Sequence, residues 1–388
     1  MAHTLQTLGG TQTSVRSDGR GAAMEGTGPV GLVVIGLGGV GSSLLTGVLA
    51  AREHLVHPFG SLAEAGGAGR TSGSGLVSLR DKAPLAELSD LQLGAFELRH
   101  DDAYRAALRA GVVSRSLVDE LRPQLRQVHA MLGARQAPTR RHLADALAED
   151  LRGFLTHHRC SRGVVVCTIP GLQDAPEKLG HTPDEVRRAL EESADWITPG
   201  VVYAAAAAQA GCAFVAAGLD AALCAPGIPA LFAEAGVPVA GAGLLGPDAA
   251  LREALAQFIA SEAMGFSGSA SLSTRAEERG ARLWGGPDRT QEMSLAGGWA
   301  GGAFELSVEL RGQVALYLAG RALDAALLID LAARAGRKGG QDWMEALFAG
   351  PLGSSTPRQA VRPTLAHRRD RLFAELPALT QGASREAA

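Results

Sequence analysis

The first apolar run of the chain predicts a buried strand that leads into a helix. Residues Gly31 to Ile35 are apolar without interruption, which is typical of a parallel strand buried on both faces, and small or apolar residues recur at helical spacing from about Val40 to Glu53. A cluster of glycines separates the two segments. Residues 1–28, which precede them, are rich in Gly, Thr and Ser, and we expect a flexible leader there.

Strand-like and helical segments then alternate as far as residue 245. Leu91 to Leu98 has the alternation of a strand, a helical stretch follows that we expect to stop at Pro123, and Arg162 to Gly171 predicts another buried strand that runs into a loop. Between the first helix and these segments, Phe59 to Gly75 is rich in glycine and has no periodicity. We expect a long loop there, which either lies over a binding site or forms a mobile flap.

The same order continues after this strand. Thr182, Pro183 and Glu185 have the spacing of a capping box with proline at the first helical position, which predicts a helix start. Thr198 to Gly218 predicts a helix and then a strand, and Ile228 to Gly243 repeats this order. Strands that alternate with helices predict an α/β fold with a doubly wound parallel sheet of Rossmann type, whose binding crevice lies beyond the carboxyl ends of the strands.

From Leu251 the pattern changes. It predicts a long helix, the segment SGSASLSTR, an alternating strand from Phe304 to Gly320, and a helix from about Arg321 to Ala335. This mixture predicts a second domain of α+β class, whose open sheet face covers a cofactor or pairs with another subunit. We therefore divide the chain into a leader (1–28), a Rossmann-type nucleotide-binding domain (29–245), an α+β domain (246–340) and a C-terminal segment that returns to the first domain (341–388).

Composition limits the classes of partner. The chain has 388 residues, of which 46% are hydrophobic and 20% charged, and its net charge of −3 gives no field for nucleic acid or an anionic membrane. We read no signal peptide or membrane span, and therefore expect a cytoplasmic protein with a small-molecule substrate. The four cysteines form no CxxC pair, and we read His157, His158 and Cys160 as a surface turn, so we predict no metal site.

The glycine cluster has the pattern of a dinucleotide grip. Gly36, Gly38 and Gly41 fit GxGxxG, with Gly39 beside them. The first glycine allows a tight turn, the second lets the backbone approach a pyrophosphate, and the third lets the helix pack closely on the strand, while the helix N-terminus faces the anion. The alternative is a glycine-rich turn that binds no ligand.

A dinucleotide grip also needs an acid for the adenosine ribose, usually about 20 residues further along. Glu53 lies in the predicted helix and Glu64 in the glycine-rich passage, and neither follows a strand. Glu97 stands at the end of a predicted strand if the intervening loop is an insertion. A carboxylate at this point favours NAD over NADP, whose 2′-phosphate it would repel, but spacing alone equally allows a solvated surface acid.

The order of motifs resembles the myo-inositol-phosphate synthase family from about Gly31 to Gly340. GLGGVGSSLLTGVLAAR is similar to the family's GxGGNNGSTLTAGVxANR, FGSLAEA to YGSLTQ, LGAFEL to GGWDI, and LRPQL to QLRPYM. ITPGVVYAAAAAQAGCAFVAAG has the spacing of ISPSxLYAxAAILEGCPFINGSPQN, and LAGRALDAALLIDLAARAGRKGG is similar to SAGVVIDAIRCAKLALDRGIGG. The shared stretches are collinear, and the block from Tyr203 to Phe214 is more specific than a glycine motif.

This resemblance implies a Rossmann-type domain, a tetramerising α+β domain and tightly held NAD. It also implies the conversion of glucose 6-phosphate to inositol phosphate by hydride removal at C5, enolisation, aldol closure and return of the hydride. Glu97 falls on the family's ribose-binding aspartate. We therefore assign the cofactor site to Gly36, Gly38, Gly39, Val40, Gly41, Ser42, Glu97, Thr168, Ile169 and Gly218.

The chain departs from the family at the lysines that its chemistry uses. The family's GDDFKSGQTKxKS falls on Gly241 to Leu255, which contains no lysine and has Ala242 and Gly243 at the two aspartate positions. A further family lysine falls near Asp330 or Leu331, and there is no lysine at all between Lys178 and Lys338. Because an ammonium group stabilises the enolate and shuttles protons in the family, the known mechanism cannot operate unchanged.

Other residues could take over part of this work. Arginine can hold a phosphate but is a poor proton shuttle, because its pKa lies above about 12. The candidate phosphate-binding arginines are Arg252, Arg275, Arg311 and Arg321. Asp324 matches an acid of the family and is either structural or catalytic, so the candidates for catalysis are Asp324, Arg311 and Arg275.

Three functions are consistent with these residues. The first is an enzyme of this superfamily that uses NAD on a sugar phosphate or a related polyol with diverged chemistry. The second is an NAD-dependent oxidoreductase or epimerase on the same scaffold, and the third is a non-catalytic paralogue that binds NAD. A homotetramer is implied by the resemblance.

Overall fold

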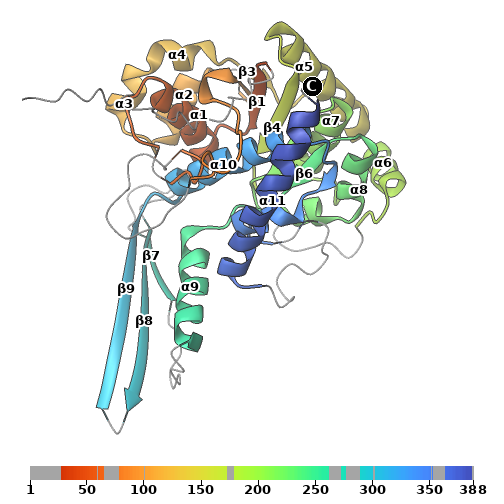
Figure 1. Cartoon of the computed structure of the whole chain (residues 1–388). Coiled ribbons are helices and arrows are strands. Elements are labelled where there is room, and N and C mark those ends of the chain that lie inside the picture. The colour runs from red at the N-terminus through yellow and green to blue at the C-terminus, as the bar shows by residue number, and fades with distance from the viewer. Residues whose placement is uncertain are drawn as a thin grey trace, which may run out of the picture.

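The main layer of the fold is a sheet of seven parallel strands, in the order β10–β6–β5–β4–β1–β2–β3 (Figure 1). The computed structural model describes residues 28–58, 60–64, 78–99, 101–172, 179–261, 272–276, 289–299, 302–350, 352 and 363–386. The strands are β1 (Val30–Ile35), β2 (Leu91–Glu97), β3 (Ala130–Leu132), β4 (Arg162–Cys167), β5 (Ala213–Ala216), β6 (Pro238–Ala240) and β10 (Gly339–Gly340). The order reverses between β1 and β4, so the predicted doubly wound sheet is confirmed, and its switch point lies there.

The continuous apolar run of β1 is explained by burial on both faces. Successive side chains of a strand point to opposite faces, so Leu32 and Val34 join one apolar cluster while Val33 and Ile35 join the other. All four are at most 1% exposed. Burying each such side chain contributes roughly 1.5–3 kcal/mol, which fixes the register of this central strand.

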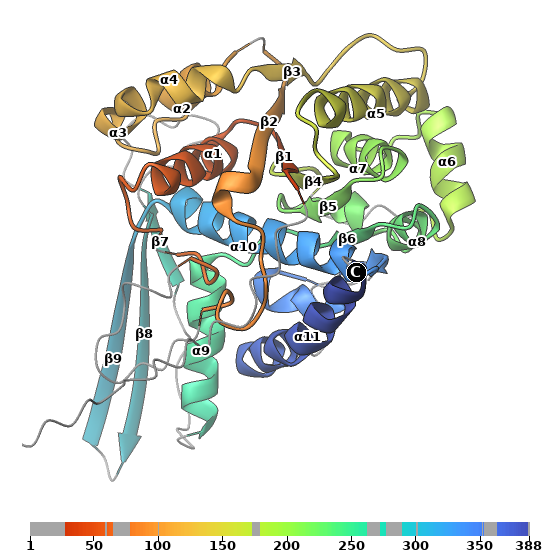
Figure 2. The ribbon, with the colours of Figure 1, turned by 45° about the horizontal axis from the view of Figure 1, so that its top comes forward.

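Helices cover both faces of the sheet. Helix α10 lies across one face and packs against α1, and α5 and α7 pack together on the other (Figure 2). The α-helices are α1 (Gly39–Arg52), α2 (Ala103–Ala110), α3 (Arg115–Glu120), α4 (Arg122–Gln127), α5 (Arg140–His157), α6 (Pro183–Glu191), α7 (Pro199–Gln209), α8 (Gly227–Glu234), α9 (Pro247–Ser261), α10 (Val314–Arg334) and α11 (Leu365–Glu386). The 3₁₀-helices are η2 (Leu88–Asp90), η3 (Ala221–Cys224) and η4 (Asp342–Leu347).

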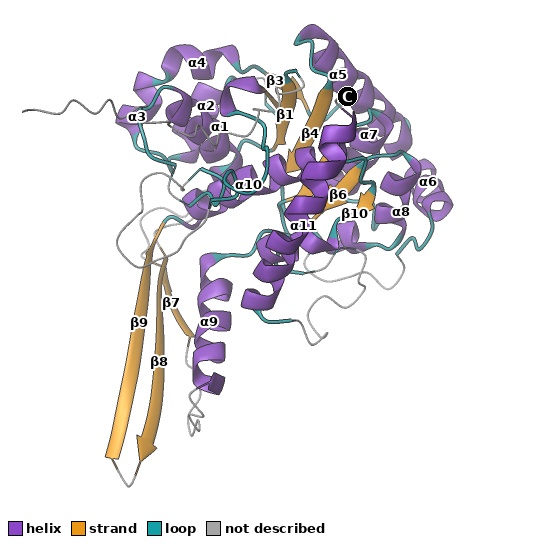
Figure 3. Ribbon diagram, viewed as in Figure 1, coloured by secondary structure: helices purple, strands orange, loops and turns teal. Residues whose placement is uncertain are grey.

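A second, antiparallel sheet extends away from this body (Figure 3). It consists of β7 (Leu272–Ala276), β8 (Arg289–Trp299) and β9 (Gly302–Gly312). The sequence pattern did not single out β8. The predicted strand from Phe304 to Gly320 is wrong beyond Gly312, because Gly312 has a φ of +150° and α10 begins two residues later.

The predicted helix stop at Pro123 is also wrong. Gly111, with a φ of +62°, ends α2, and Pro123 lies in the first turn of α4, where the missing N–H costs no helical hydrogen bond. The capping box of Thr182 and Glu185 is present at the start of α6, as predicted. Helix α5 and strand β3 were not predicted.

The C-terminal helix α11 packs against α10 and η4. Helix α10 itself contributes its buried side chains to the apolar cluster that it shares with α1, although it lies within the range that we predicted as a separate domain. Residues 1–27 of the predicted leader (1–28) lie outside the described residues, as do residues 59 and 65–75 of the glycine-rich passage from Phe59 to Gly75. Within the described part of the chain, no helix has the length and apolar character needed to cross a membrane.

Candidate functional site

The glycine loop lies at the carboxyl end of β1, at the switch point of the sheet. Gly36 has a φ of +86°, which side chains rarely adopt, and its N–H donates to the carbonyl of Phe96 at 3.0 Å. A Cβ on Gly41 would lie 2.1 Å from the carbonyl oxygen of Gly36. Glycine at these positions therefore permits the tight turn and the close packing of α1 on β1.

The N-terminus of α1 opens onto this loop without a side-chain cap. Gly38 is the N-cap, its carbonyl accepts from the N–H of Ser42 at 2.9 Å, and no acidic residue stands in the first turn. The first N–H groups of the helix, from Gly39, Val40 and Gly41, have no intrahelical acceptor. Together with the glycine cradle, this arrangement fits the pyrophosphate of a dinucleotide. The Ser42 hydroxyl donates to the carbonyl of Leu37 at 2.8 Å and so shapes the loop.

Glu97 lies directly beside the glycine loop because β2 pairs with β1. Its Oε2 accepts from the N–H of Leu37 at 2.9 Å and its Oε1 from the N–H of Leu98 at 2.8 Å. A carboxylate can accept about four hydrogen bonds, so each oxygen keeps capacity for a ribose hydroxyl. Tyr203 packs its ring 5.5 Å from that of Phe96 and donates to the carbonyl of Gly133, which holds the neighbouring segment.

The other two acids considered for the ribose lie elsewhere. Glu53 follows the last turn of α1, at the opposite end from the glycine loop, and its Oε1 accepts from Gln124 at 3.3 Å. Glu64 pairs with Arg80 at 2.6 Å. The described geometry therefore favours Glu97.

The loop after β4 packs against the glycine loop. Thr168 Oγ1 donates to the carbonyls of Ile35 and Gly36, at 3.0 and 2.8 Å. A Cβ on Gly36 would lie 2.5 Å from Cγ2 of Ile169, and one on Gly218 would lie 2.1 Å from the carbonyl oxygen of Ile169. The structure thus brings Thr168, Ile169 and Gly218 to the same crevice as the glycine loop.

Asp220 is a residue of this crevice that the sequence analysis missed. It is 1% exposed, and its carboxylate accepts from the hydroxyl of Thr198 at 2.5 Å and from the N–H groups of Leu172 and Ala222, both at 3.1 Å. Burial raises its pKa, while these donors act in the opposite direction. Asp220 therefore ties the β4 loop to the start of α7.

Two glycines mark the position of this buried carboxylate, but they can be recognised only once the structure is known. A Cβ on Gly171 would lie 2.1 Å from the carboxyl carbon of Asp220, and one on Gly200 would lie 2.6 Å from its Oδ2. The two glycines make room for the acid, yet they are distant from it along the chain.

Asp324 is fully buried in α10 and holds the loop of residues 60–64. Its Oδ1 accepts from the Ser61 hydroxyl at 2.7 Å and from the Ala63 N–H at 3.0 Å, and its Oδ2 accepts from the Leu62 N–H at 2.8 Å. Burial raises its pKa to about 6, against the lowering effect of these donors and of Arg321. With its oxygens engaged by the backbone, Asp324 is a positioning residue for this loop.

The remaining arginine candidates are distributed over the molecule. Arg275 and Arg311 occupy one register row of the second sheet, each paired with Thr290 of β8, and their side chains lie outside the described ones. Arg252 pairs with Asp248 at 2.9 Å on α9. Arg321 lines a pocket between α10 and α11.

Asp330, which stands near a lysine of the resembled family, does not reach the crevice. It is buried and pairs with Arg162 at 2.7 Å and with Arg334 at 3.0 Å. Because Arg162 is the first residue of β4, this ion pair lies at the amino edge of the sheet, opposite the glycine loop. Asp330 therefore has no direct contact with the crevice.

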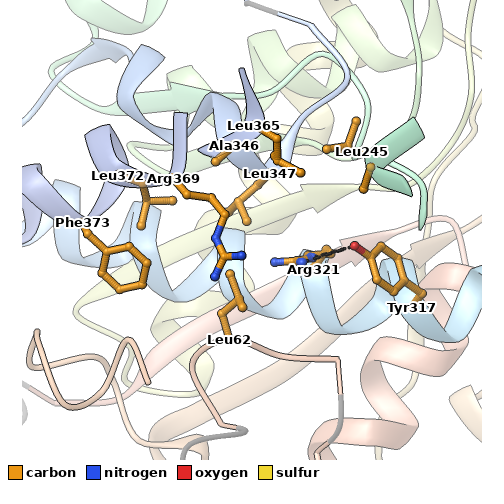
Figure 4. A pocket seen from close by; sticks show the side chains of 11 residues that line it. Leu62, Leu245, Tyr317, Arg321, Ala346, Leu347, Leu365, Arg369, Leu372 and Phe373 are labelled. Atoms are coloured by element: carbon orange, nitrogen blue, oxygen red, sulfur yellow. Dashed lines mark hydrogen bonds between the residues drawn. The ribbon is translucent and has the colours of Figure 1, made fainter. Parts of the chain in front are cut away.

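A pocket lies between the loop of residues 60–64, the start of α9, η4 and the helices α10 and α11 (Figure 4). Leu245 lines it, two positions after Gly243. In the lysine-bearing segment that this part of the chain resembles, the corresponding residue is a lysine. The polar side chains that line the pocket are Tyr317, Arg321 and Arg369.

Among the described residues, no group of three or more His, Cys, Asp or Glu side chains is placed to hold a metal ion. The rings of His157 and His158 lie 4.9 Å apart, and that of His158 packs 4.5 Å from Phe154. Cys160 is a free, half-buried thiol.

Comparison with known proteins agrees with this geometry. A family model for an NAD-binding domain, described as myo-inositol-1-phosphate synthase, matches residues 30–355. The chain is 24% identical over 393 residues to inositol-3-phosphate synthase 1 of Bacteroides thetaiotaomicron, a match that covers 84% of this chain and 90% of the relative.

Two solved structures share the fold. Inositol-3-phosphate synthase from Caenorhabditis elegans matches with a TM-score of 0.74 and 16% identity, over 91% of this chain and 86% of the other. A myo-inositol-1-phosphate synthase-related protein from Thermotoga maritima matches with a TM-score of 0.64 and 14% identity, over 90% of this chain and 98% of the other.

Proposed function

The chain belongs to the myo-inositol-1-phosphate synthase family, and from this premise we propose that it converts a sugar phosphate or a related polyol with NAD, by chemistry that differs from the family's lysine-dependent cyclisation. The observation that carries the proposal is the contact of Glu97 with the Leu37 N–H at the glycine loop. This contact supports the proposal, because a carboxylate suited to the ribose lies beside a helix N-terminus suited to the pyrophosphate.

NAD is the cofactor of this family, and the residues at the switch point fit it. The loop from Gly36 to Gly41 would hold the pyrophosphate, and Glu97 would accept from the ribose hydroxyls. Thr168, Ile169 and Gly218 would form the wall opposite the glycine loop. When bound, NAD supplies a site that removes a hydride from a carbinol and returns it.

The side chains that line the pocket beside the loop of residues 60–64 support the proposed difference in chemistry. Leu245 offers no proton and no charge, and the nearest acid on α10, Asp324, is committed to Ser61, Leu62 and Ala63. An enolisation that relies on ammonium groups has no equivalent partner among these side chains. A reaction that needs only oxidation and re-reduction does not require these ammonium groups.

A second candidate function is a non-catalytic paralogue that binds NAD. The specific observation that favours it is the apolar character of the same pocket, where Leu62, Leu245 and Leu347 stand. Such a protein would keep the cofactor grip intact while losing acid and base groups.

The experiment begins with the purified protein, from which the nucleotide is released and identified by mass spectrometry. We expect NAD. The protein is then incubated with glucose 6-phosphate and a panel of sugar phosphates and polyols, and products are followed by NMR together with absorbance at 340 nm.

The proposal expects turnover of a phosphorylated or polyol substrate with no net accumulation of NADH. Bound NAD without turnover of any substrate in the panel would favour the non-catalytic paralogue, while net NADH would favour an oxidoreductase. A chain that carries no nucleotide and binds none would contradict all three functions. The implied tetramer and cytoplasmic location stay predictions.

A further inference from the structure

Two guanidinium groups turn toward the same space between α10 and α11. Figure 4 shows Arg369 reaching down from α11 toward Leu62, with Arg321 of α10 on the other side of the pocket. Like charges on two sides of one pocket repel, although Arg369 is exposed and water screens part of this repulsion. An anion bound between the two guanidinium groups would remove the repulsion and pair with both.

The carboxylates around this pocket are already engaged. Glu253 pairs with the buried Arg368, and Glu345 pairs with Arg371 at 3.3 Å. Asp324 lies 3.9 Å from Arg321 but is held by the loop of residues 60–64.

Arg369 itself forms no ion pair or hydrogen bond with any residue that the structure describes. Its neighbours on α11, Arg368 and Arg371, both have carboxylate partners. The Arg369 guanidinium, which enters the pocket from α11, is thus available to pair with a ligand.

Tyr317 supplies a third donor. Its hydroxyl oxygen accepts from Nε and Nη2 of Arg321, at 3.4 and 3.2 Å, and the guanidinium carbon of Arg321 lies 5.3 Å from the centre of the Tyr317 ring. Because the phenol acts as an acceptor in these bonds, its own hydrogen is free to donate, and the described residues offer it no acceptor. The contact also restrains Arg321, so little ordering entropy is lost when a ligand binds.

The remaining side chains of the pocket contribute neither charge nor acceptors. They are Leu62, Leu245, Ala250, Ala346, Leu347, Leu365, Leu372 and Phe373. A ligand group that suits this lining has several acceptor oxygens and a double negative charge, which two guanidinium groups can bind in a bidentate manner. A phosphate monoester meets this description, whereas a neutral polyol would leave its hydroxyls without partners.

We propose that Tyr317, Arg321 and Arg369 form a phosphate-binding subsite that holds the phosphate monoester of a small-molecule ligand between α10 and α11. This deepens the proposed function, on which it rests for the small-molecule nature of the ligand. Leu62, which belongs to the loop that Asp324 holds, and Arg369 of α11 line the same pocket. A bound phosphate would therefore contact both α11 and this loop.

The test is isothermal titration calorimetry on the full chain at low ionic strength, with inorganic phosphate, glucose 6-phosphate and glucose as probes. Wild-type protein is expected to bind both phosphate compounds and not glucose. Arg369→Gln should weaken phosphate binding at least about tenfold and Tyr317→Phe a few-fold, because each removes a donor to the anion. Arg369→Lys keeps the charge but loses the fork of donors, and should fall between Arg369→Gln and wild type.

Arg371→Gln is the matched control, since Arg371 lies on the same helix and pairs with Glu345 outside the pocket lining. It should bind phosphate as wild type does. Equal weakening by Arg371→Gln and Arg369→Gln, or no phosphate binding by wild type, would overturn the subsite.

The NAD content and melting temperature of each variant are measured in parallel. Normal NAD content and folding in Arg369→Gln, combined with unchanged phosphate affinity, would reject the subsite while leaving the proposed function in place. Absence of NAD from wild type would instead count against the proposed function.

Discussion

Replacing Glu97 with alanine is expected to weaken the binding of NAD about 100-fold, because the proposed site gives this carboxylate two charge-assisted hydrogen bonds to the ribose. The carboxylate also accepts from the Leu37 N–H, so its loss relaxes the glycine loop itself. The measurement is calorimetric titration of NAD into protein freed of nucleotide, with the melting temperature recorded to show that the variant folds.

Two variants make this result specific. Glu53→Ala removes an acid from the far end of the same helix, α1, and should bind NAD as wild type does. Glu97→Gln keeps the shape of the side chain but no longer repels a 2′-phosphate, so the ratio of NADP to NAD affinity should rise. If Glu97→Ala retains wild-type affinity, the assignment of Glu97 to the ribose is wrong.

Asp324→Ala should lower the free energy of unfolding by about 3 kcal/mol at neutral pH, because three buried donors lose their acceptor. The affected donors are the Ser61 hydroxyl and the N–H groups of Leu62 and Ala63, so the loop of residues 60–64 should also detach from α10. Urea denaturation gives the free energy, and hydrogen exchange of the Leu62 and Ala63 amides reports the loop. Ser61→Ala, which removes one donor and leaves the acceptor, should cost about 1 kcal/mol.

The same carboxyl group predicts a pH dependence. Its pKa of about 6 in the folded state exceeds the ordinary value of 3.8, so the folded chain binds the proton more tightly than the unfolded chain. The stability contribution of this proton is complete below the unfolded pKa and is lost as the pH rises through the folded one. Between about pH 5 and about pH 8, wild type should lose about 1 kcal/mol relative to Asp324→Ala.

A stability difference that stays constant over this range would show that Asp324 does not titrate there. A difference that grows as the pH rises would mean that the folded state lowers the pKa of this group. Either result would contradict the raised pKa of Asp324. It would not contradict the hydrogen bonds between Asp324 and the loop of residues 60–64.

The sequence by itself determined the elements whose signals are local. The apolar run of β1, the glycines of the loop and the capping box at Thr182 each depend on neighbouring residues, so the nucleotide grip and the doubly wound order could be predicted. Collinear motifs then identified the family. The absence of the family's lysines between Lys178 and Lys338 was likewise evident from the sequence alone.

Local signals failed where a segment suits two structures. The stretch after Gly312 alternates like a strand but forms α10, because burial against α1 and the main sheet favours a helix there. Pro123 is compatible with the start of a helix as well as with its end, and the local pattern does not distinguish the two cases.

Tertiary structure alone decided which distant groups meet. Parallel pairing of β2 with β1 places the Glu97 carboxylate 2.9 Å from the Leu37 N–H across sixty positions of sequence, whereas the usual spacing rule pointed elsewhere. Asp324 became a positioning residue because its burial obliges it to accept from the loop of residues 60–64. The pocket of Arg321 and Arg369 exists because α11 packs beside α10, and no periodicity within either helix encodes that contact.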